Sequence, residues 1–162
     1  MKKLEEKIAD ILIDKNLTIT VAESCTGGLV NSRLTDVSGS SAYVSQGFVT
    51  YANKAKQKYL GVKTETLQKF GAVSEQTVTE MVEGILQKTD ADIALATSGI
   101  AGPNSDNSKK PVGLLFIGVG NRQKKVITKF TAETILSRIE MKDLFTQKAL
   151  DELYKFLNTN YF

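Results

Sequence analysis

TITVAESCTGG, residues 18–28, is the stretch that decides the fold, because it passes from a strand pattern straight into a turn. Residues 18–22 form a short β-branched run that is typical of a buried strand. Gly27 and Gly28 then mark a tight turn, and residues 29–34 continue with a helical pattern. A strand, a turn and a helix in this order predict an α/β unit.

The same alternation of helix and strand patterns continues along the rest of the chain. Ser137 and Glu140 have the spacing of a capping box, and Asn53 and Ser74 are expected to cap two earlier helices. The short connection at residues 121–122 predicts an antiparallel hairpin. The predicted helices cover residues 4–16, 29–34, 53–60, 64–70 and two further stretches that begin after Ser74 and Ser137, and the predicted strands cover 18–22, 47–51, 91–97, 113–120 and 125–130. We therefore predict one three-layer α/β/α domain with a mixed sheet over residues 1–162.

The composition narrows the class of function. Hydrophobic residues make up 41% of the 162 residues and charged residues 24%, which is typical of a globular chain. The net charge is only +3 and the lysines are interleaved with acids, so we expect no nucleic-acid partner. No apolar run approaches the length of a membrane span, and the first residues do not resemble a signal peptide. These features predict a cytoplasmic protein without a membrane partner.

The chain contains no histidine and a single cysteine, Cys25. The lack of histidine excludes Ser-His-Asp and Cys-His catalysis as well as histidine-based zinc sites. One cysteine cannot form an internal disulfide or a thiolate metal cage. Any catalysis must then use serine, threonine, cysteine, lysine, tyrosine, arginine or carboxylates, or a borrowed cofactor. We expect neither a metal nor a cofactor.

The turn that contains Glu23, Ser24, Thr26, Gly27 and Gly28 is a candidate binding site. A turn between a strand and a helix offers backbone N–H groups and the positive end of the helix, which suit a phosphate or carboxylate. The pattern is neither a dinucleotide-binding nor a Walker motif, and a plain capped turn explains it equally well. The cysteine beside it is more simply read as a small core residue than as a nucleophile.

A second candidate contains Ser41, Tyr51 and Lys56. A serine nucleophile without histidine needs another base, and a lysine near a helix start and shielded from water has a lowered pKa that favours the neutral amine. Tyr51 then either relays a proton or holds the amine. The spacing alone favours a simpler interpretation, in which the tyrosine packs at a sheet edge and the lysine is solvated.

A third candidate is the segment SGIAGP, residues 98–103, which directly follows a predicted strand. Glycines at a strand end allow the backbone to form a wall around a ligand. Two such glycine-rich strand ends in one small domain favour a real pocket. Its expected binding residues are Ser98, Gly99, Ala101 and Gly102.

The combination of these stretches resembles the CinA C-terminal domain family, which includes nicotinamide-nucleotide amidases. The matching segments are TVAESCTGGLV, GSSAYVSQGFVTYANKAK, GAVSE, SGIAGP and KPVG, which occur in that order and cover most of the chain. The resemblance implies a stand-alone α/β/α amidase that hydrolyses nicotinamide mononucleotide to nicotinate mononucleotide and ammonia.

The resemblance also implies roles for individual residues. It assigns Ser41 as the nucleophile, Lys56 as the general base and Tyr51 as a helper in proton transfer. It places Arg138, just before the last helix, on the phosphate or ribose, together with the turn at residues 24–28.

Two other hypotheses stay open at this stage. In one, Cys25 is the nucleophile and works with Glu23 and a lysine. In the other, the chain is a non-catalytic module that binds a pyridine nucleotide in competence or DNA repair complexes. A homodimer is the expected assembly, because two-fold dimers are the commonest symmetry.

Overall fold

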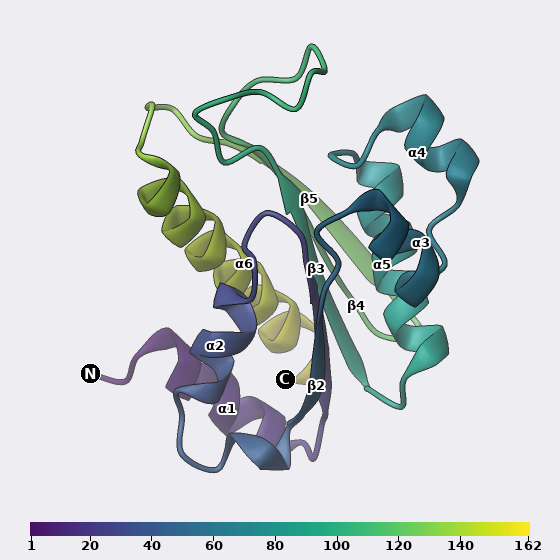
Figure 1. The fold of residues 1–162 in the computed structure, drawn as a ribbon. Helices are drawn as coiled ribbons and strands as arrows, with labels where there is room; N and C mark the ends of the chain where they lie inside the picture. The colour runs from purple at the N-terminus through teal and green to yellow at the C-terminus, as the bar shows by residue number, and fades with distance from the viewer.

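A five-stranded sheet lies at the centre of the molecule, with helices on both faces (Figure 1). The computed structural model describes all 162 residues. The strands are β1 (Ile19–Glu23), β2 (Val44–Val49), β3 (Ile93–Gly99), β4 (Leu114–Gly120) and β5 (Lys125–Thr131). The helices are α1 (Leu4–Asp14), α2 (Leu29–Thr35), α3 (Asn53–Leu60), α4 (Thr64–Phe70), α5 (Glu75–Lys88) and α6 (Arg138–Tyr161), with a 3₁₀ turn η1 at Ser40–Ala42.

The sheet is mixed, as predicted. The strand order is β2-β1-β3-β4-β5, in which β1 pairs in parallel with both β2 and β3. The hairpin of β4 and β5 adds two antiparallel strands at the other side of β3. All five residues of β1 are buried, because helices cover both faces of a central strand.

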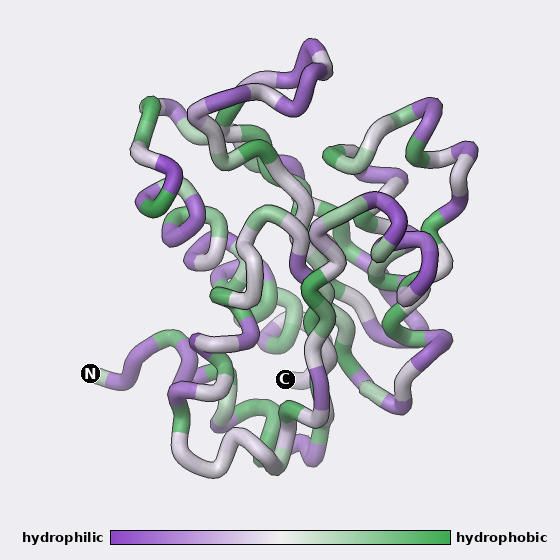
Figure 2. Tube along the Cα trace, viewed as in Figure 1, coloured by the Kyte–Doolittle hydropathy of each residue, from purple (hydrophilic) through white to green (hydrophobic).

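Each face of the sheet has its own apolar core. The helices α1, α2 and α6 cover one face, and α3 and α5 cover the other, with α4 beside α5 (Figure 1). Figure 2 shows the matching pattern, with hydrophobic residues along the strands and hydrophilic ones on the outer turns and the loop beyond β3. Phe145 of α6 and Met81 of α5 are fully buried on opposite faces, and truncating such a side chain to alanine typically costs ~2–5 kcal/mol of stability.

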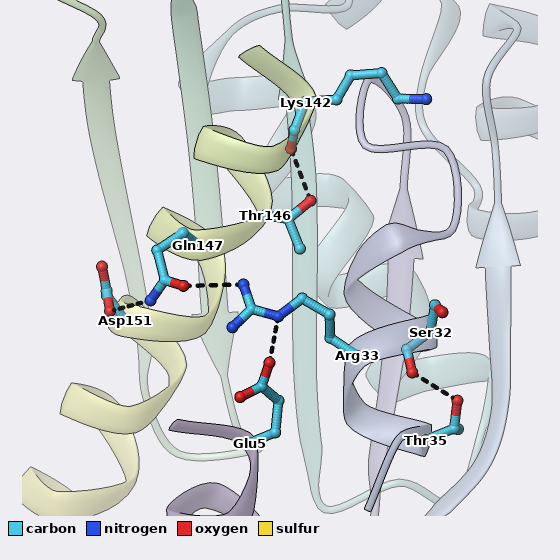
Figure 3. Close-up of polar contacts among 8 residues, drawn as sticks. All are labelled: Glu5, Ser32, Arg33, Thr35, Lys142, Thr146, Gln147 and Asp151. Atoms are coloured by element: carbon cyan, nitrogen blue, oxygen red, sulfur yellow. Dashed lines mark hydrogen bonds and ion pairs between the residues drawn. The ribbon is translucent and has the colours of Figure 1, made fainter. Parts of the chain in front are cut away.

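Polar contacts fix how α6 begins and how it packs. Ser137 and Glu140 form the predicted capping box at its first turn. On the same layer, Arg33 of α2 is paired with Glu5 of α1 and donates to Gln147 of α6 at 3.0 Å (Figure 3). These contacts connect the three helices that cover this face of the sheet.

One predicted strand is displaced in the structure. The strand expected at residues 47–51 runs instead from Val44 to Val49, so Tyr51 follows the strand rather than ending it. The helix after it begins at Asn53 with Ala52 at the N-cap, so the prediction that Asn53 is the cap was wrong by one position. None of the helices is both long enough and apolar enough to cross a bilayer.

Candidate active site

The carboxyl ends of β1 and β3 form the floor of a pocket. After β1 the chain passes through α2 to β2, which lies on one side of β1 in the strand order. After β3 the chain goes the opposite way, to β4 on the other side of β3. Neighbouring strands whose connections leave in opposite directions open a crevice, the usual ligand position in α/β sheets. The cavity has a volume of about 290 Å³ and is lined by Ser24, Cys25, Tyr51, Ala72, Val73, Ser98, Gly99, Ile100, Ala101, Gly102, Asn104, Ser105, Asp106 and Arg138.

Ser24 and Lys56 meet beneath this pocket. Ser24 is the first residue after β1, and its backbone N–H donates to the carbonyl of Thr97 on β3 at 3.1 Å. Lys56 reaches it from the first half of α3, and its Nζ lies 2.9 Å from the Oγ of Ser24. A hydroxyl and an amine at this distance can exchange a proton directly.

Lys56 is held in place by three acceptors. Besides Ser24, its Nζ donates to the carbonyl oxygens of Thr50 at 2.7 Å and Tyr51 at 3.1 Å. The side chain is completely buried, and none of the ion pairs in the structure involves it. Burial therefore lowers the pKa of the Lys56 amine from 10.5 to about 8, partly offset by the nearby thiol of Cys25. A buried lysine with a pKa near neutrality and a serine partner is a candidate general base.

Tyr51 and Arg138 form one side of the pocket. The side chain of Tyr51 is 58% exposed, and its hydroxyl accepts a hydrogen bond of 2.8 Å from Arg138. Arg138 also donates to the carbonyl of Gly102 at 2.6 Å. The arginine thus joins the end of β2 to the loop after β3. The phenol of Tyr51 contacts Arg138 and not Lys56, so only its backbone carbonyl touches the amine.

The opposite wall is built from the third candidate segment. Ser98 is buried, and its hydroxyl donates to the carbonyl of Ala72 at 2.8 Å, which ties the end of β3 to the turn before α5. The amine of Lys110 donates to the carbonyls of Phe70 and Val73, both at 2.5 Å. This lysine anchors the loop that returns from the pocket to β4.

Ser41 lies at the wrong end of the sheet for the predicted role. It is exposed, in the 3₁₀ turn that precedes β2, whereas Tyr51 and Lys56 follow that strand. A strand of six residues separates its two ends by roughly 17 Å. The structure therefore does not bring Ser41 to Lys56, and Ser24 occupies the position in which Ser41 was expected.

Glu23 and Thr26 do not line the pocket either. The carboxylate of Glu23 is buried and accepts from the hydroxyl of Thr26 at 2.6 Å and from the N–H groups of Val30 and Asn31 at 2.8 and 3.0 Å. These N–H groups belong to the first turn of α2, so the chain's own carboxylate fills the anion site that the sequence assigned to a ligand. Thr26 is turned inward as well, with its hydroxyl 2.8 Å from that of Thr97.

Gly27 and Gly28 serve the turn rather than the pocket lining. Both have positive φ, 61° and 104°, a backbone conformation that favours glycine. Gly27 is exposed, and a Cβ added to it would lie 3.5 Å from the Nζ of Lys142 on α6. The expected contact of these two glycines with the substrate is therefore not supported by the pocket lining.

Cys25 lines the pocket but is poorly suited to be a nucleophile. The residue is only 5% exposed, and burial raises the pKa of its thiol to about 12. The reactive form of cysteine is the thiolate, which is scarce at neutral pH when the pKa is this high. The neighbouring Glu23 adds to the effect through its negative charge.

A larger hollow of about 510 Å³ lies beyond Val73, between α5 and the hairpin. Lys110 and Lys129 line it together with Phe70 and Phe116, but it holds no paired nucleophile and base. No group of three or more Asp, Glu and Cys side chains is close enough together to hold a metal ion. The smaller pocket is therefore the candidate active site.

A signal for Ser24 was present in the sequence. Ser24 follows a buried strand directly, and Lys56 lies in the helix after the next strand. The carboxyl ends of parallel strands meet at one edge of the sheet, so these two positions are brought together, whereas a residue that precedes a strand is not. Ala72 and residues 104–106 had no comparable signal, because they reach the pocket from loops.

Comparisons with known proteins agree with this fold. A "CinA-like protein" from Chloroherpeton thalassium is 48% identical over 159 residues, which are 97% of this chain and 38% of that protein. A second "CinA-like protein", from Chlorobium phaeobacteroides, is 46% identical over 157 residues, 95% of this chain and 37% of that protein. The chain thus spans less than two fifths of the length of these curated relatives.

Solved structures and the family profile cover the chain almost completely. The competence damage-inducible protein A from Klebsiella pneumoniae is 32% identical, with a TM-score of 0.92 over 98% of this chain and 97% of that one. The competence/damage inducible protein CihA from Agrobacterium tumefaciens is 40% identical, with a TM-score of 0.88 over 98% and 99%. The profile described as "CinA C-terminal domain" matches residues 1–157. The chain belongs to the CinA C-terminal domain family.

Proposed function

We propose that this chain is an amide hydrolase that converts nicotinamide mononucleotide to nicotinate mononucleotide and ammonia. In this proposal Ser24 is the nucleophile and Lys56 is the general base. The observation that carries it is the 2.9 Å contact between the hydroxyl of Ser24 and a buried amine whose pKa is lowered to about 8. The resemblance of the sequence to nicotinamide-nucleotide amidases supplies the substrate.

The reaction begins when the neutral amine of Lys56 accepts the proton of the Ser24 hydroxyl. The Oγ then forms a bond to the carboxamide carbon, and the carbonyl oxygen becomes an oxyanion. The Lys56 ammonium returns the proton to the amide nitrogen, so the C–N bond breaks and ammonia leaves. Lys56 next takes a proton from water, whose oxygen attacks the ester, and Ser24 is released together with the carboxylate product.

Other groups in the pocket suit the charges of this reaction. Cys25 and Ala101 line the pocket, and their backbone N–H groups donate to no backbone carbonyl of the protein, so they are available to an oxyanion. Preorganised donors of this kind usually supply a large share of the rate enhancement. Arg138, fixed by Tyr51 and Gly102, contributes a positive charge at the mouth. The cationic pyridinium ring withdraws electrons and makes the amide easier to attack.

A second candidate function is a non-catalytic module that binds a pyridine nucleotide in competence or DNA repair complexes. The observation that favours it is the naming of related structures as competence or damage-inducible proteins. A binding module does not need a buried lysine that contacts a serine and has no carboxylate partner. The presence of such a lysine, Lys56, favours the hydrolase.

Incubation with nicotinamide mononucleotide separates the two functions. The hydrolase releases one ammonia for each nucleotide and raises the mass of the nucleotide by about one dalton, because an amide becomes an acid. A ligand that is bound and recovered unchanged supports the module instead. The Ser24→Ala variant is the matched control, because its folded pocket lacks the nucleophile.

A further inference from the structure

Lys142 is a cation near the pocket residue Arg138, and its amine forms no ion pair within the protein. It lies one turn after Arg138 on α6, so both side chains are on the same side of the helix. Its Nζ is directed at the loop between β1 and α2 (Figure 3), where it would lie 3.5 Å from a Cβ on Gly27. The side chain is partly buried, and none of the four ion pairs includes it.

The position of this amine relative to Ser24 can be bounded. The N–H of Gly27 donates to the carbonyl of Ser24 at 3.1 Å, which closes a four-residue turn. The first and last Cα atoms of such a turn are less than about 7 Å apart, so the Lys142 ammonium lies within about 12 Å of the Cα of Ser24. This is close to the length of a nicotinamide nucleotide between its carboxamide and its phosphate.

The usual anion site beside this turn is already filled. The N–H groups at the start of α2 donate to the carboxylate of Glu23, so they are not free to bind a phosphate. Arg138 is engaged by Tyr51 and Gly102. Lys142 is the cation on this side of the pocket that has no hydrogen-bond acceptor of its own within the protein.

We propose that Lys142 is the phosphate-binding residue of the site and makes it selective for phosphorylated pyridine amides over the corresponding nucleosides. This proposal rests on the proposed function for the identity of the substrate. With the carboxamide at Ser24, the phosphate extends past Arg138 to the ammonium over Gly27. Glycine at position 27 leaves room for both, because it has no side chain.

The test separates binding from turnover by using the Ser24→Ala variant as the host. Calorimetry measures its Kd for nicotinamide mononucleotide and for nicotinamide riboside, which lacks the phosphate. Adding Lys142→Gln is expected to weaken nucleotide binding about tenfold, or ~1.4 kcal/mol, and riboside binding by less than about twofold. Lys142→Arg should retain most of the affinity, since it keeps the charge.

Lys155→Gln is the matched control, because it removes one exposed lysine from the far part of the same helix. It should leave both Kd values unchanged. Equal losses for nucleotide and riboside in Lys142→Gln, or the same loss in Lys155→Gln, would overturn the proposal.

Inorganic phosphate gives a reading that does not depend on catalysis. Phosphate should raise the Tm of the unmodified protein, and Lys142→Gln should remove most of that rise. If the protein releases no ammonia but nicotinamide mononucleotide and inorganic phosphate still bind through Lys142, the hydrolase proposal fails and the anion site stands. If ammonia is released and Lys142→Gln changes nothing, only the anion site fails.

Discussion

The Nζ of Lys56 lies 2.9 Å from the Oγ of Ser24, and the two residues come from segments that follow different strands of the sheet. The contact is buried and has no carboxylate to balance the lysine charge. Its chemistry therefore depends on whether the amine is protonated.

Replacing Ser24 should abolish the proposed reaction, whereas replacing Ser41 should not. Ser24→Ala is expected to lower kcat at least about a thousandfold, because the nucleophile is lost. Ser41→Ala, in an exposed turn at the opposite end of β2, should stay within about twofold of the unmodified chain. Ammonia release from nicotinamide mononucleotide measures both, with circular dichroism to show that each variant is folded. Activity that survives in Ser24→Ala and disappears in Ser41→Ala would restore the sequence-based assignment.

The rate should rise with pH through the pKa of Lys56. A base with a pKa of about 8 is neutral in roughly a tenth of the molecules at pH 7 and in about nine tenths at pH 9. We therefore expect kcat/KM to rise about tenfold between these values and then level off. The exposed Lys54 lies on the same helix, so Lys54→Met should show the same profile. A rate that is flat from pH 7 to 9 in the unmodified protein argues against Lys56 as the base.

The same pKa shift predicts how stability depends on pH. The folded pKa of Lys56 is about 8, below its ordinary 10.5, so between these values the unfolded chain binds more protons than the folded one. Stability should therefore rise with pH across this window, by ~3 kcal/mol for the full shift. The destabilisation is fully present below pH 8.

Urea unfolding at several pH values between 7 and 10 measures this effect as the difference between the unmodified chain and Lys56→Met. The variant has no buried charge, so it should be more stable at pH 7, and its advantage should shrink as the pH rises. Lys54→Met serves again as the control. An advantage that stays constant over this range would mean that Lys56 titrates normally.

Cys25 should be dispensable for the chemistry. With a pKa of about 12, only about one thiol in ten thousand is ionised at pH 8. Cys25→Ala should therefore keep most of its kcat and lose ~1 kcal/mol of stability, because the sulfur fills space against Phe145 and Gly99. Iodoacetamide labelling should be slow in the folded protein. Rapid labelling with a parallel loss of ammonia release would revive the cysteine nucleophile.

Glu23 should act on stability rather than on substrate affinity. In Glu23→Gln one amide oxygen can still accept, but an NH₂ group must face an N–H at the start of α2. Losing an acceptor at a buried donor costs ~1–3 kcal/mol. Chemical unfolding of this variant, with the exposed Glu65→Gln as a control, tests the assignment. A higher KM with unchanged stability would mean that the carboxylate binds the substrate after all.

The helix boundaries were largely predictable from the sequence. Helices α3 and α4 end where predicted because Gly61 and Gly71 follow them with positive φ, which few other residues adopt. The capping residues Ser74 and Ser137 also begin their helices as predicted. These signals are local, so the neighbouring residues alone carry them.

The position of β2 was not predictable in the same way. It is an edge strand whose first half is polar and exposed, including Ser45 and Gln46, so its apolar pattern starts late. Strand propensity depends on which face and which edge a strand occupies, and a single sequence does not reveal this. The strand therefore begins three residues earlier and ends two residues earlier than the apolar pattern predicts.

The direction of a side chain at a turn could not be predicted from the sequence either. The sequence shows Glu23 beside a glycine-rich turn, where a carboxylate can face either a ligand or its own helix. Only the fold shows that it turns inward to α2. The same holds for Lys56, whose burial depends on packing between distant segments.

The position of β2 at the edge of the sheet has a consequence for heat inactivation. This strand pairs with β1 alone, and the carbonyls of Thr50 and Tyr51 that hold the Lys56 amine lie just beyond its end. Edge strands open at a lower free energy than central strands. When β2 separates from β1, Lys56 loses the carbonyls that hold its amine, whereas Ser24 stays in place because its N–H is bonded to β3. The proposed activity thus depends on the least protected part of the sheet, and it should be lost reversibly at temperatures at which the amides of β1 and β3 still resist hydrogen exchange.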